Sequence, residues 1–348
     1  MFRILTLKDQ QEWISIIDKF RDKDVYYLPS YTKAFEIHGD GQPILIYFED
    51  QLRNLKAANV AMLRDISEID KFRDIIEPNQ YFDLMTPYGY GGFIFEGNFM
   101  KDDLNRFNKE YELFCIDNKI VSEFVRVHPL HNNLNKLEKI YELTEHGKTI
   151  SLSLDSKQEI WDNFTSKNRN IIRKAIKSGV EVYWGRSQAL LDEFIPLYKN
   201  TMNHDNASDY YYFSDDFYKS IIYDLKYNMM FFYAVKDSTI ASIAMILFDN
   251  HSMHYHLSAS NRMFQKYAPN NLLLSEVAIW GLENGFTNFH LGGGLGGQED
   301  SLFKFKKAFN KSDPNKFYLG KKIFNNIIYE ELSNKIQTKS DYFPKYRA

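Results

Sequence analysis

The chain has 348 residues, of which 44% are apolar, and a formal net charge of −3. This length suits about two domains of ~150 residues each. A protein that binds nucleic acid over its whole surface is usually basic, so the charge balance excludes that class and leaves room only for local anion sites.

The chain contains one cysteine, Cys115, which excludes an internal disulfide. Its sequence context predicts a buried, inert thiol on the apolar side of a helix end. The first residues carry no signal-peptide pattern, and the longest apolar run, residues 240–248, is far shorter than the ~20 residues that span a bilayer. We therefore expect a soluble, cytoplasmic protein.

The two halves of the chain look like distant copies. In each, paired tyrosines precede a short helix with a serine cap, and a β-hairpin follows. Tyr26 and Tyr211 are 185 positions apart, and the turn residues Asp50 and Asp237 are 187 apart. We predict the hairpin turns at Glu49-Asp50 and at Lys236-Asp237.

Each half then ends in a helix, an asparagine and a strand, which predicts two similar α/β domains. We place the first domain at residues 1–148 and the second at 149–316. We expect the strand and helix of residues 317–348 to pack back on the first domain.

The second half has a readable order of elements. It begins with a strand at 149–154, and a helix starts at Ser166 and closes at Gly179. The remaining predicted elements are a strand at 180–184, a helix at 187–202, the hairpin, a strand at 252–260, a helix at 271–285, a strand at 287–291 and a short helix. This order is mixed α/β.

A glycine cluster follows the strand at 287–291. Gly292, Gly294 and Gly297 satisfy G-x-G-x-x-G, but a dinucleotide site needs an acid at a strand end ~20 residues on, whereas Asp313 lies in a predicted turn. No G-K-[ST] follows, which excludes a P-loop. Two interpretations stay open: a loop that needs positive φ or close packing, or backbone that approaches a ligand.

Two basic clusters have equally open interpretations, as solvated faces or as phosphate contacts. Residues 302–322 carry seven lysines against one acid and interleave Phe303, Phe305 and Phe309; the lysines are Lys304, Lys306, Lys307, Lys311, Lys316, Lys321 and Lys322. The other cluster is Lys167, Arg169, Arg173, Lys174 and Lys177. There we expect Arg169, Arg173 and Lys177 on one helix face, with Ile172, Ala175 and Ile176 on the other.

Other motifs are less specific. His254 and His256 are expected on one strand face, but no further ligand stands at a matching spacing, so we expect no metal. Asn270 or Asn271 is expected to cap a helix whose N-terminus suits a phosphate.

Taken in order, several stretches make the chain resemble the FemX/FemAB-like transferases, which have two tandem GNAT (acyl-CoA N-acyltransferase) domains. These stretches are "TPYGYGGF", "EFVRVHP", "NRNIIRKAIKSGVEV", "TMNHDNASDYYYF", "YAPNNLLLSEVAIWG", "FHLGGG" and "SLFKFKKAF". The resemblance implies an α/β fold with α+β-type mixed sheets in two tandem GNAT-like domains.

The resemblance also implies site residues. Phe305 and Lys306 would lie at the reacting centre, with the lysine near the activated acyl group. The acceptor side would include Tyr210, Tyr211, Tyr212, Thr201, His204, Arg169, Tyr88 and His256. The donor side would include Asn270, Asn271, Gly292, Gly293 and Lys304. Glu276, Asp209, His256 and the substrate itself are candidates for the general base.

The implied function is transfer of an acyl or aminoacyl group onto an amine of a cell-envelope precursor, either a peptidoglycan peptide or a polysaccharide amino sugar. No cofactor is expected to be bound; the co-substrate is aminoacyl-tRNA or acyl-CoA. The lysines at 302–322 favour tRNA. The net charge favours acyl-CoA, the smaller donor. His204 also favours it, because this residue stands where the family often has an arginine that contacts acceptor phosphates.

Two alternatives remain: an acetyl-CoA-dependent N-acetyltransferase acting on a small amine, and a non-catalytic binding module. We expect no DNA partner. A lipid-linked acceptor would make the protein peripheral to a membrane.

Overall fold

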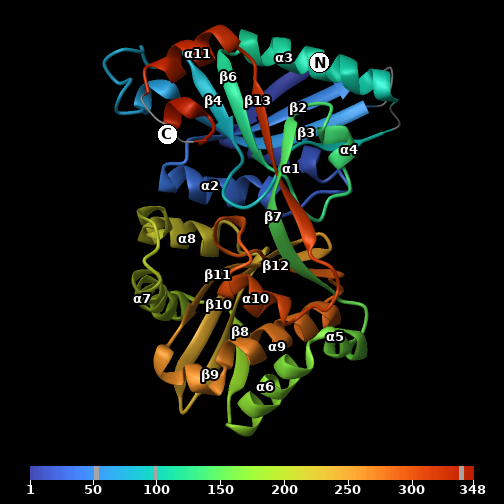
Figure 1. Cartoon of the computed structure of the whole chain (residues 1–348), viewed down its shortest axis with the longest axis vertical. Helices are drawn as coiled ribbons and strands as arrows, with labels where there is room; N and C mark the ends of the chain where they lie inside the picture. The colour runs from blue at the N-terminus through green and yellow to red at the C-terminus, as the bar shows by residue number, and fades with distance from the viewer. Residues whose placement is uncertain (51–54, 98–99, 337–340) are drawn as a thin grey trace. The chain divides into compact units, whose positions relative to one another are not determined.

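The computed structural model describes residues 1–50, 55–97, 100–336 and 341–348. The chain divides into two compact units (Figure 1). Unit 1 comprises Met1–His146 and Phe317–Ala348, and unit 2 comprises Gly147–Lys316. The end of the chain therefore belongs to unit 1, together with its beginning.

Unit 1 contains a sheet in which the parallel pair β4–β6 is embedded among antiparallel neighbours. A further strand, β5 (Ile94–Glu96), pairs with β3 but stands outside the main strand order of the sheet. The strand order is β1 (Phe2–Thr6), β2 (Gln42–Asp50), β3 (Leu55–Asp65), β4 (Phe82–Met85), β6 (Ile120–Arg126) and β13 (Asn315–Ile323).

Helices lie on both sides of this sheet, with α3 on one side and α1 and α2 on the other (Figure 1). Leu104, Phe107, Tyr111 and Cys115 recur at helical spacing along α3 and are buried in one core. Cys115 is fully buried, as predicted, and this burial raises the pKa of its thiol. The helices are η1 (Leu7–Asp9), α1 (Gln10–Ile17), η2 (Val25–Tyr27), α2 (Pro29–His38), η3 (Ile66–Glu68), α3 (Lys101–Asp117), α4 (Leu134–Leu137), α11 (Asn326–Asn334) and η7 (Lys345–Arg347).

Unit 2 repeats the strand order of unit 1. Its single parallel pair is β11–β12, at the place that β4–β6 holds in unit 1. The order is β8 (Glu181–Gly185), β9 (Met229–Lys236), β10 (Thr239–Asp249), β11 (Ser252–Ser260), β12 (Asn288–Gly292) and β7 (Glu142–Ser153). The predicted α/β fold with mixed sheets is confirmed.

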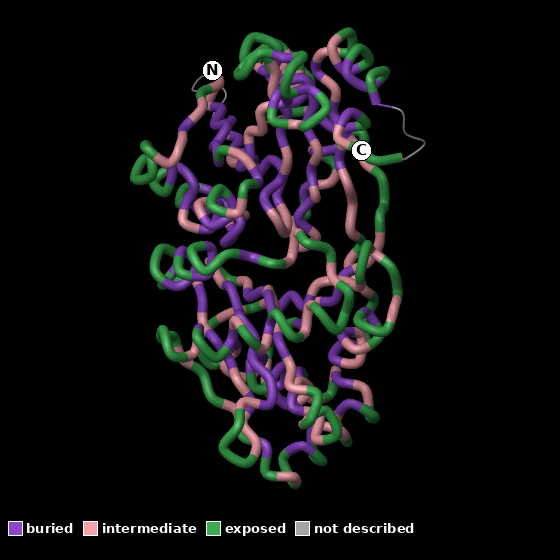
Figure 2. Tube along the Cα trace, turned by 90° about the vertical axis from the view of Figure 1, so that its left-hand side faces the viewer, coloured by how far each residue is buried: buried purple, intermediate pink, exposed green. Residues whose placement is uncertain are grey.

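The two faces of the unit 2 sheet are covered by different helices. Side chains of α5, α6, α9 and α10 share one core with alternate residues of the strands, whereas α7 and α8 pack on the other face, where Phe194 contacts Phe231. In the tube of Figure 2, buried segments lie mostly in the interior of each unit, and exposed segments lie at its periphery. The helices are α5 (Lys157–Asn163), α6 (Ser166–Lys177), α7 (Gln188–His204), η4 (Asp209–Tyr211), α8 (Asp215–Tyr223), η5 (Arg262–Tyr267), α9 (Pro269–Glu283), η6 (Leu295–Gly297) and α10 (Ser301–Lys307).

Some local predictions need correction. Ser214 caps α8 as expected, but Leu28 stands at the N-cap of α2 with Pro29 at the first helical position; proline fits there because that N–H has no helical partner. Glu49 and Asp50 lie inside β2, and residues 51–54, which follow them, lie outside the described residues.

The second hairpin turn is close to its predicted place. It consists of Asp237 and Ser238, both with positive φ, as hairpin turns of the primed types require. On α6, Ile172 and Ala175 are buried as expected, but Ile176 is exposed, so the expected apolar face is narrower than its sequence suggested.

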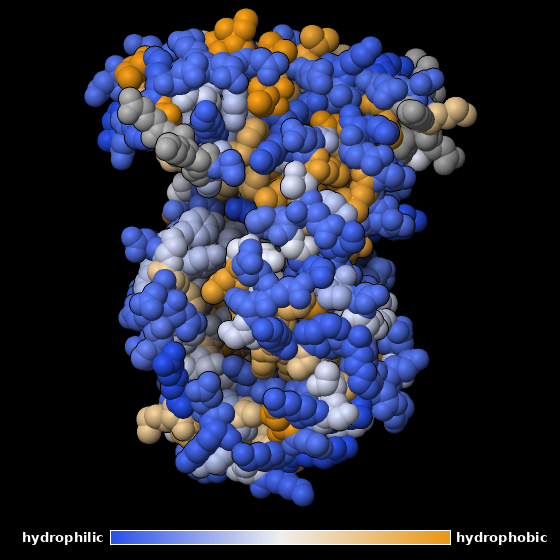
Figure 3. Space-filling view, viewed as in Figure 1, coloured by the Kyte–Doolittle hydropathy of each residue, from blue (hydrophilic) through white to orange (hydrophobic). Residues whose placement is uncertain are grey.

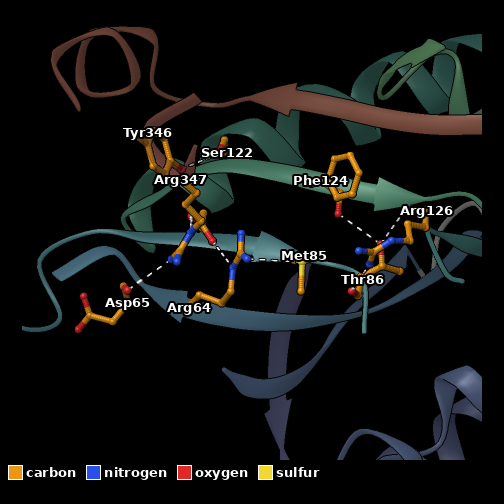
Figure 4. Close-up of polar contacts among 10 residues, drawn as sticks. Arg64, Asp65, Met85, Thr86, Ser122, Phe124, Arg126, Tyr346 and Arg347 are labelled. Carbon is orange, nitrogen blue, oxygen red and sulfur yellow. Dashed lines mark hydrogen bonds and ion pairs between the residues drawn. The ribbon is translucent and has the colours of Figure 1, made fainter. Parts of the chain in front are cut away.

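The last residues of the chain are fastened inside unit 1 (Figure 4). Tyr346 is fully buried, and its hydroxyl lies 2.7 Å from Ser122 Oγ. The fully buried Asp83 carboxylate accepts hydrogen bonds from Arg347 Nε at 2.5 Å and from Arg64 Nε at 2.6 Å. Removing one partner of a buried charge network is costly, so this cluster fixes the C-terminal segment to β4 and β6.

We predict that Tyr346→Ala lowers the free energy of unfolding by about 3 kcal/mol, because it removes a buried aromatic ring and leaves a cavity. Urea denaturation monitored by fluorescence measures the effect. Tyr342→Ala is the matched control in the same segment, because that side chain is 51% exposed. Equal midpoints for the two variants would show that the C-terminal segment does not contribute to the unit 1 core.

Candidate active site

The two parallel strands of unit 2 separate part of the way along. Their ladder runs from Ser252–Asn288 to His254–His290. Beyond it, β11 continues beside β10 to Ser260, and β12 continues beside β7. From Tyr255 onward, therefore, one edge of β11 no longer pairs with β12. We call this place the β11–β12 separation.

A bulge in β11 accompanies the separation. The register with β10 passes from Leu257 to Tyr255 and leaves His256 as an extra residue. The bulge interrupts the two-residue alternation on which the expected common face of His254 and His256 depended. His254 instead lies beside His290, with 5.6 Å between the ring centroids.

The equivalent strands of unit 1 stay joined (Figure 4). The β4–β6 ladder reaches Met85–Phe124, and Thr86 then continues the contact. The Thr86 N–H donates to the carbonyl of Phe124 at 3.0 Å, and the Arg126 N–H donates to Thr86 Oγ1 at 2.7 Å. The threonine side chain thus bridges the two strands, so the candidate site belongs to unit 2.

Lys306 lies at the β11–β12 separation. Its side chain projects from α10 and is only 8% exposed. The ammonium donates to the carbonyl of Gly293, just after β12, at 2.7 Å. It also lies 5.9 Å from the ring centroid of Tyr255, the first β11 residue past the ladder. The ammonium therefore touches both sides of the separation.

The surroundings of Lys306 tune its charge. Burial lowers the pKa of this ammonium to about 8, and the Asp300 carboxylate acts in the opposite direction. A lysine with a pKa near 8 stays mostly protonated at pH 7. A positive charge held away from water is well placed to stabilise an oxyanion that develops nearby.

The glycine loop packs against β7 within unit 2. A Cβ on Gly293 would lie 2.7 Å from the carbonyl oxygen of Lys148, and one on Gly147 would lie 2.4 Å from that of Gly297. Gly292 and Gly297 also have positive φ. The glycines thus allow close backbone packing, and the same packing presents the Gly293 carbonyl to Lys306.

The segment assigned to the acceptor is attached to the far end of β11. Thr201 Oγ1, in the last turns of α7, accepts a hydrogen bond from Ser260 N at 3.2 Å and donates to the carbonyl of Leu197. The hydroxyl of Tyr212 donates to Asn203 Oδ1 at 2.7 Å. His204 is exposed at the end of α7, and Tyr210 and Tyr211 lie in η4.

The expected cap of α9 is wrong. Its N-cap residue is Ala268, in the left-handed conformation with no side-chain cap bond. Asn270 instead donates to Ser260 Oγ at 2.7 Å, and Asn271 donates to Asn168 Oδ1 at 2.8 Å. Both asparagines therefore fasten the start of α9 to neighbouring elements, and their donor-binding role stays a prediction.

Other assigned residues have local partners. Arg169 Nη1 donates to three carbonyls at the end of α5, the shortest bond being 3.0 Å to Phe164. Phe305 is partly buried against Phe309. Tyr88 belongs to unit 1, where it stacks on Phe35.

The candidates for the general base differ in environment. Glu276 and Asp209 are exposed. Burial lowers the pKa of His256 to about 3, with a smaller contribution from His254, so this imidazole is neutral and a weak base near pH 7.

Several of the seven lysines of residues 302–322 have partners within their own unit, and a phosphate contact by this run stays a prediction. Lys307 donates to the carbonyls of Asn310 and Ser312, and Lys311 donates to that of Asp162. Lys322 is buried in unit 1, where it contacts Glu112 at 2.8 Å. Several lysines thus satisfy backbone carbonyls, while Lys304 stays exposed. The surface seen in Figure 3 is mainly hydrophilic over unit 2, where α6 contributes the exposed Lys167, Arg173, Lys174 and Lys177.

Sequence reasoning missed Tyr255 and Asp300. Tyr255 lies between two histidines on a strand, and that pattern carries no signal for contact with a lysine fifty residues away. Asp300 could have been found, because an aspartate before a helical run is a typical N-cap.

Comparison with known proteins places the second half in a fold class. Residues 166–307 match the family model described as the acetyltransferase (GNAT) domain. Unit 2 is therefore similar to a GNAT domain over most of its length, and unit 1 has the same strand order. Among the described residues, no helix combines the length and apolarity needed to cross a membrane.

Individual solved structures with a similar fold define the fold of the whole chain more closely. The crystal structure of FemX superimposes with a TM-score of 0.67 at 15% identity and covers 95% of this chain and 99% of its own. A conserved protein from Bacteroides thetaiotaomicron gives a TM-score of 0.58 at 13% identity, covering 92% and 99%. The chain therefore has the FemX-like GNAT fold, as its motifs predicted.

One curated protein matches at the level of sequence. The UDP-N-acetylmuramoylpentapeptide-lysine N(6)-alanyltransferase of Weissella viridescens is 28% identical over 176 residues, 49% of this chain and 51% of that protein. The match thus spans about half the length of this relative.

We predict that the amine of Lys306 titrates near pH 8, well below the ordinary lysine value of ~10.4, because burial disfavours its charged form. Acetic anhydride reacts with the neutral amine only. The labelled Lys306 peptide, quantified by mass spectrometry across pH, should therefore show a midpoint near 8. A midpoint near 10 would mean that the side chain is solvated.

Proposed function

We propose that this chain is an acyltransferase that moves an activated acyl or aminoacyl group onto an amine of a cell-envelope precursor. The observation that carries the proposal is the buried Lys306 ammonium at the β11–β12 separation. The FemX-like fold and the sequence similarity to an alanyltransferase support it.

In the proposed reaction, a neutral amine of the acceptor attacks the carbonyl carbon of the donor. The carbonyl oxygen gains negative charge, and Lys306 stabilises that oxyanion by charge. An amide bond then forms, the ester or thioester bond breaks, and the leaving group takes the electron pair. The attacking nitrogen loses a proton to a base, for which His256 is poorly suited.

We propose a peptidoglycan precursor peptide as the acceptor, because the curated relative is named for transfer to the lysine of such a precursor. The acceptor would contact the segment that contains Thr201 and the tyrosines of η4. His204 stands there in place of the family's arginine, and an imidazole lacks the bidentate N–H fork with which a guanidinium holds a phosphate. An amino sugar of a surface polysaccharide is therefore the alternative acceptor.

We propose aminoacyl-tRNA as the donor. Residues 166–177, which form α6, contain five Lys and Arg residues and no acid, whereas residues 188–224, on the opposite face, contain seven acids and two lysines. A helix surface that carries several cations and no acid suits the repeated phosphates of RNA, while acyl-CoA needs only a small cradle. We propose the cytoplasm as the location, where either donor is made.

We predict that Lys306→Ala lowers the rate of transfer about 10²- to 10³-fold, the usual loss when one oxyanion-stabilising group is removed. Transfer is measured by mass spectrometry of the acceptor. The control is Lys157→Ala, which removes an exposed lysine of the same unit paired with Glu283. Equal rates for both variants would remove Lys306 from the mechanism.

A panel of donors tests the choice between aminoacyl-tRNA and acyl-CoA. Incubation of the protein with mixed charged tRNAs, acyl-CoAs and envelope precursors should yield an aminoacylated precursor, with turnover that falls steeply as salt rises. Salt-insensitive transfer from acetyl-CoA would instead establish the N-acetyltransferase alternative. Tight precursor binding without turnover of any donor would support a binding module.

A further inference from the structure

The start of α10 is joined to the glycine loop by one side chain. Asp300 is the N-cap of α10, and its Oδ1 accepts a hydrogen bond from Phe303 N at 2.8 Å. Its other oxygen, Oδ2, accepts from Leu295 N, in the loop, at 3.1 Å. A single carboxylate therefore holds the loop and the first turn of the helix together.

The loop is shaped to close on this carboxylate. A Cβ on Gly294 would lie 2.4 Å from Asp300 Oδ1 and 2.0 Å from the carbonyl oxygen of Gln298. The φ of Gly294 is −86°, which any residue can adopt, so close approach to Asp300 and Gln298 is the reason that a glycine is needed here.

A second contact joins the same loop to the same helix. Lys306, six residues after Asp300, reaches back to the carbonyl of Gly293. The loop is thus held on both sides of Gly294, by Asp300 at Leu295 and by Lys306 at Gly293. If the first contact is lost, α10 can shift relative to the loop, and the ammonium can move away from Tyr255.

The carboxylate also acts on the charge of Lys306. Burial lowers the pKa of the ammonium, and Asp300 opposes this change. The pKa of Asp300 is itself lowered, first by the Phe303 N–H and in a smaller part by Lys306. A negative charge at residue 300 therefore favours the protonated form of Lys306, the form that stabilises an oxyanion.

We propose that Asp300 is a positioning residue, which ties the glycine loop to α10 and thereby holds the Lys306 ammonium at the β11–β12 separation. Its catalytic meaning rests on the role proposed above for Lys306. The geometric claim, that Asp300 holds α10 against the glycine loop, does not rest on that role, because Lys306 labelling can be measured on the unliganded protein.

The test compares Asp300→Ala with Ser156→Ala. Ser156 is the N-cap of α5 and accepts from Glu159 N at 3.2 Å, so this control loses a helix cap in the same unit without touching the loop. Circular dichroism first checks that both variants fold. The pH dependence of acetic anhydride labelling at Lys306 is then measured for each.

We expect Asp300→Ala to raise the midpoint of Lys306 labelling from about 8 toward the ordinary lysine value of ~10.4, because α10 is no longer tied to the loop and the ammonium gains contact with water. Ser156→Ala should keep the wild-type profile. Asp300→Glu should restore part of the midpoint, since it returns the carboxylate. A fall of the midpoint would overturn the proposal, because it means that the ammonium stays buried in its position and has lost only the opposing charge.

An unchanged labelling profile in a folded Asp300→Ala protein would overturn the proposal and leave Asp300 as an ordinary helix cap. This outcome is separable from failure of the proposed function. If Lys306 has no part in transfer, Lys306→Ala retains its turnover, whatever labelling shows for Asp300. If both roles hold, Asp300→Ala lowers kcat more than it changes KM.

Discussion

The parallel pairing of β11 with β12 is the constraint on which the site depends. Parallel strands cannot be joined by a tight hairpin, so the chain must cross over between them, and here it does so through η5 and α9. The ladder lasts three residue pairs before the strands part. Lys306 reaches this place because the glycine loop after β12 turns the chain into α10 directly beside it.

The two units share one strand order but differ in the side chains beside their parallel strands. In unit 1 the side chain of Thr86 continues the contact between the parallel strands, and the interior carries a buried Glu123, whose pKa burial raises to about 7 although Asn59 and Tyr111 donate to it. In unit 2 the strands β11 and β12 separate, and the side chain of Lys306 lies at this separation. A shared fold does not imply a shared function; the local side chains decide it.

Several backbone carbonyls at helix ends in this protein accept hydrogen bonds from long side chains that lie nearby in the sequence. Arg169 covers the carbonyls at the end of α5, and Lys307 covers those that follow α10. Such contacts explain why a run of lysines need not be an anion-binding surface. Unmet backbone carbonyls are costly when buried, and an ammonium can serve several of them.

The sequence alone determined the repeat, the order of helices and strands and the burial of Cys115, because these follow from local periodicity. It also predicted a role for Lys306, through the family resemblance. The tertiary structure decided which partners those residues have. Tyr255 lies near Lys306 only because β11 and α10, which are distant in sequence, fold together. The asparagines of α9 and Lys311 also take partners that folding brings near. Local propensity does not encode such long-range contacts.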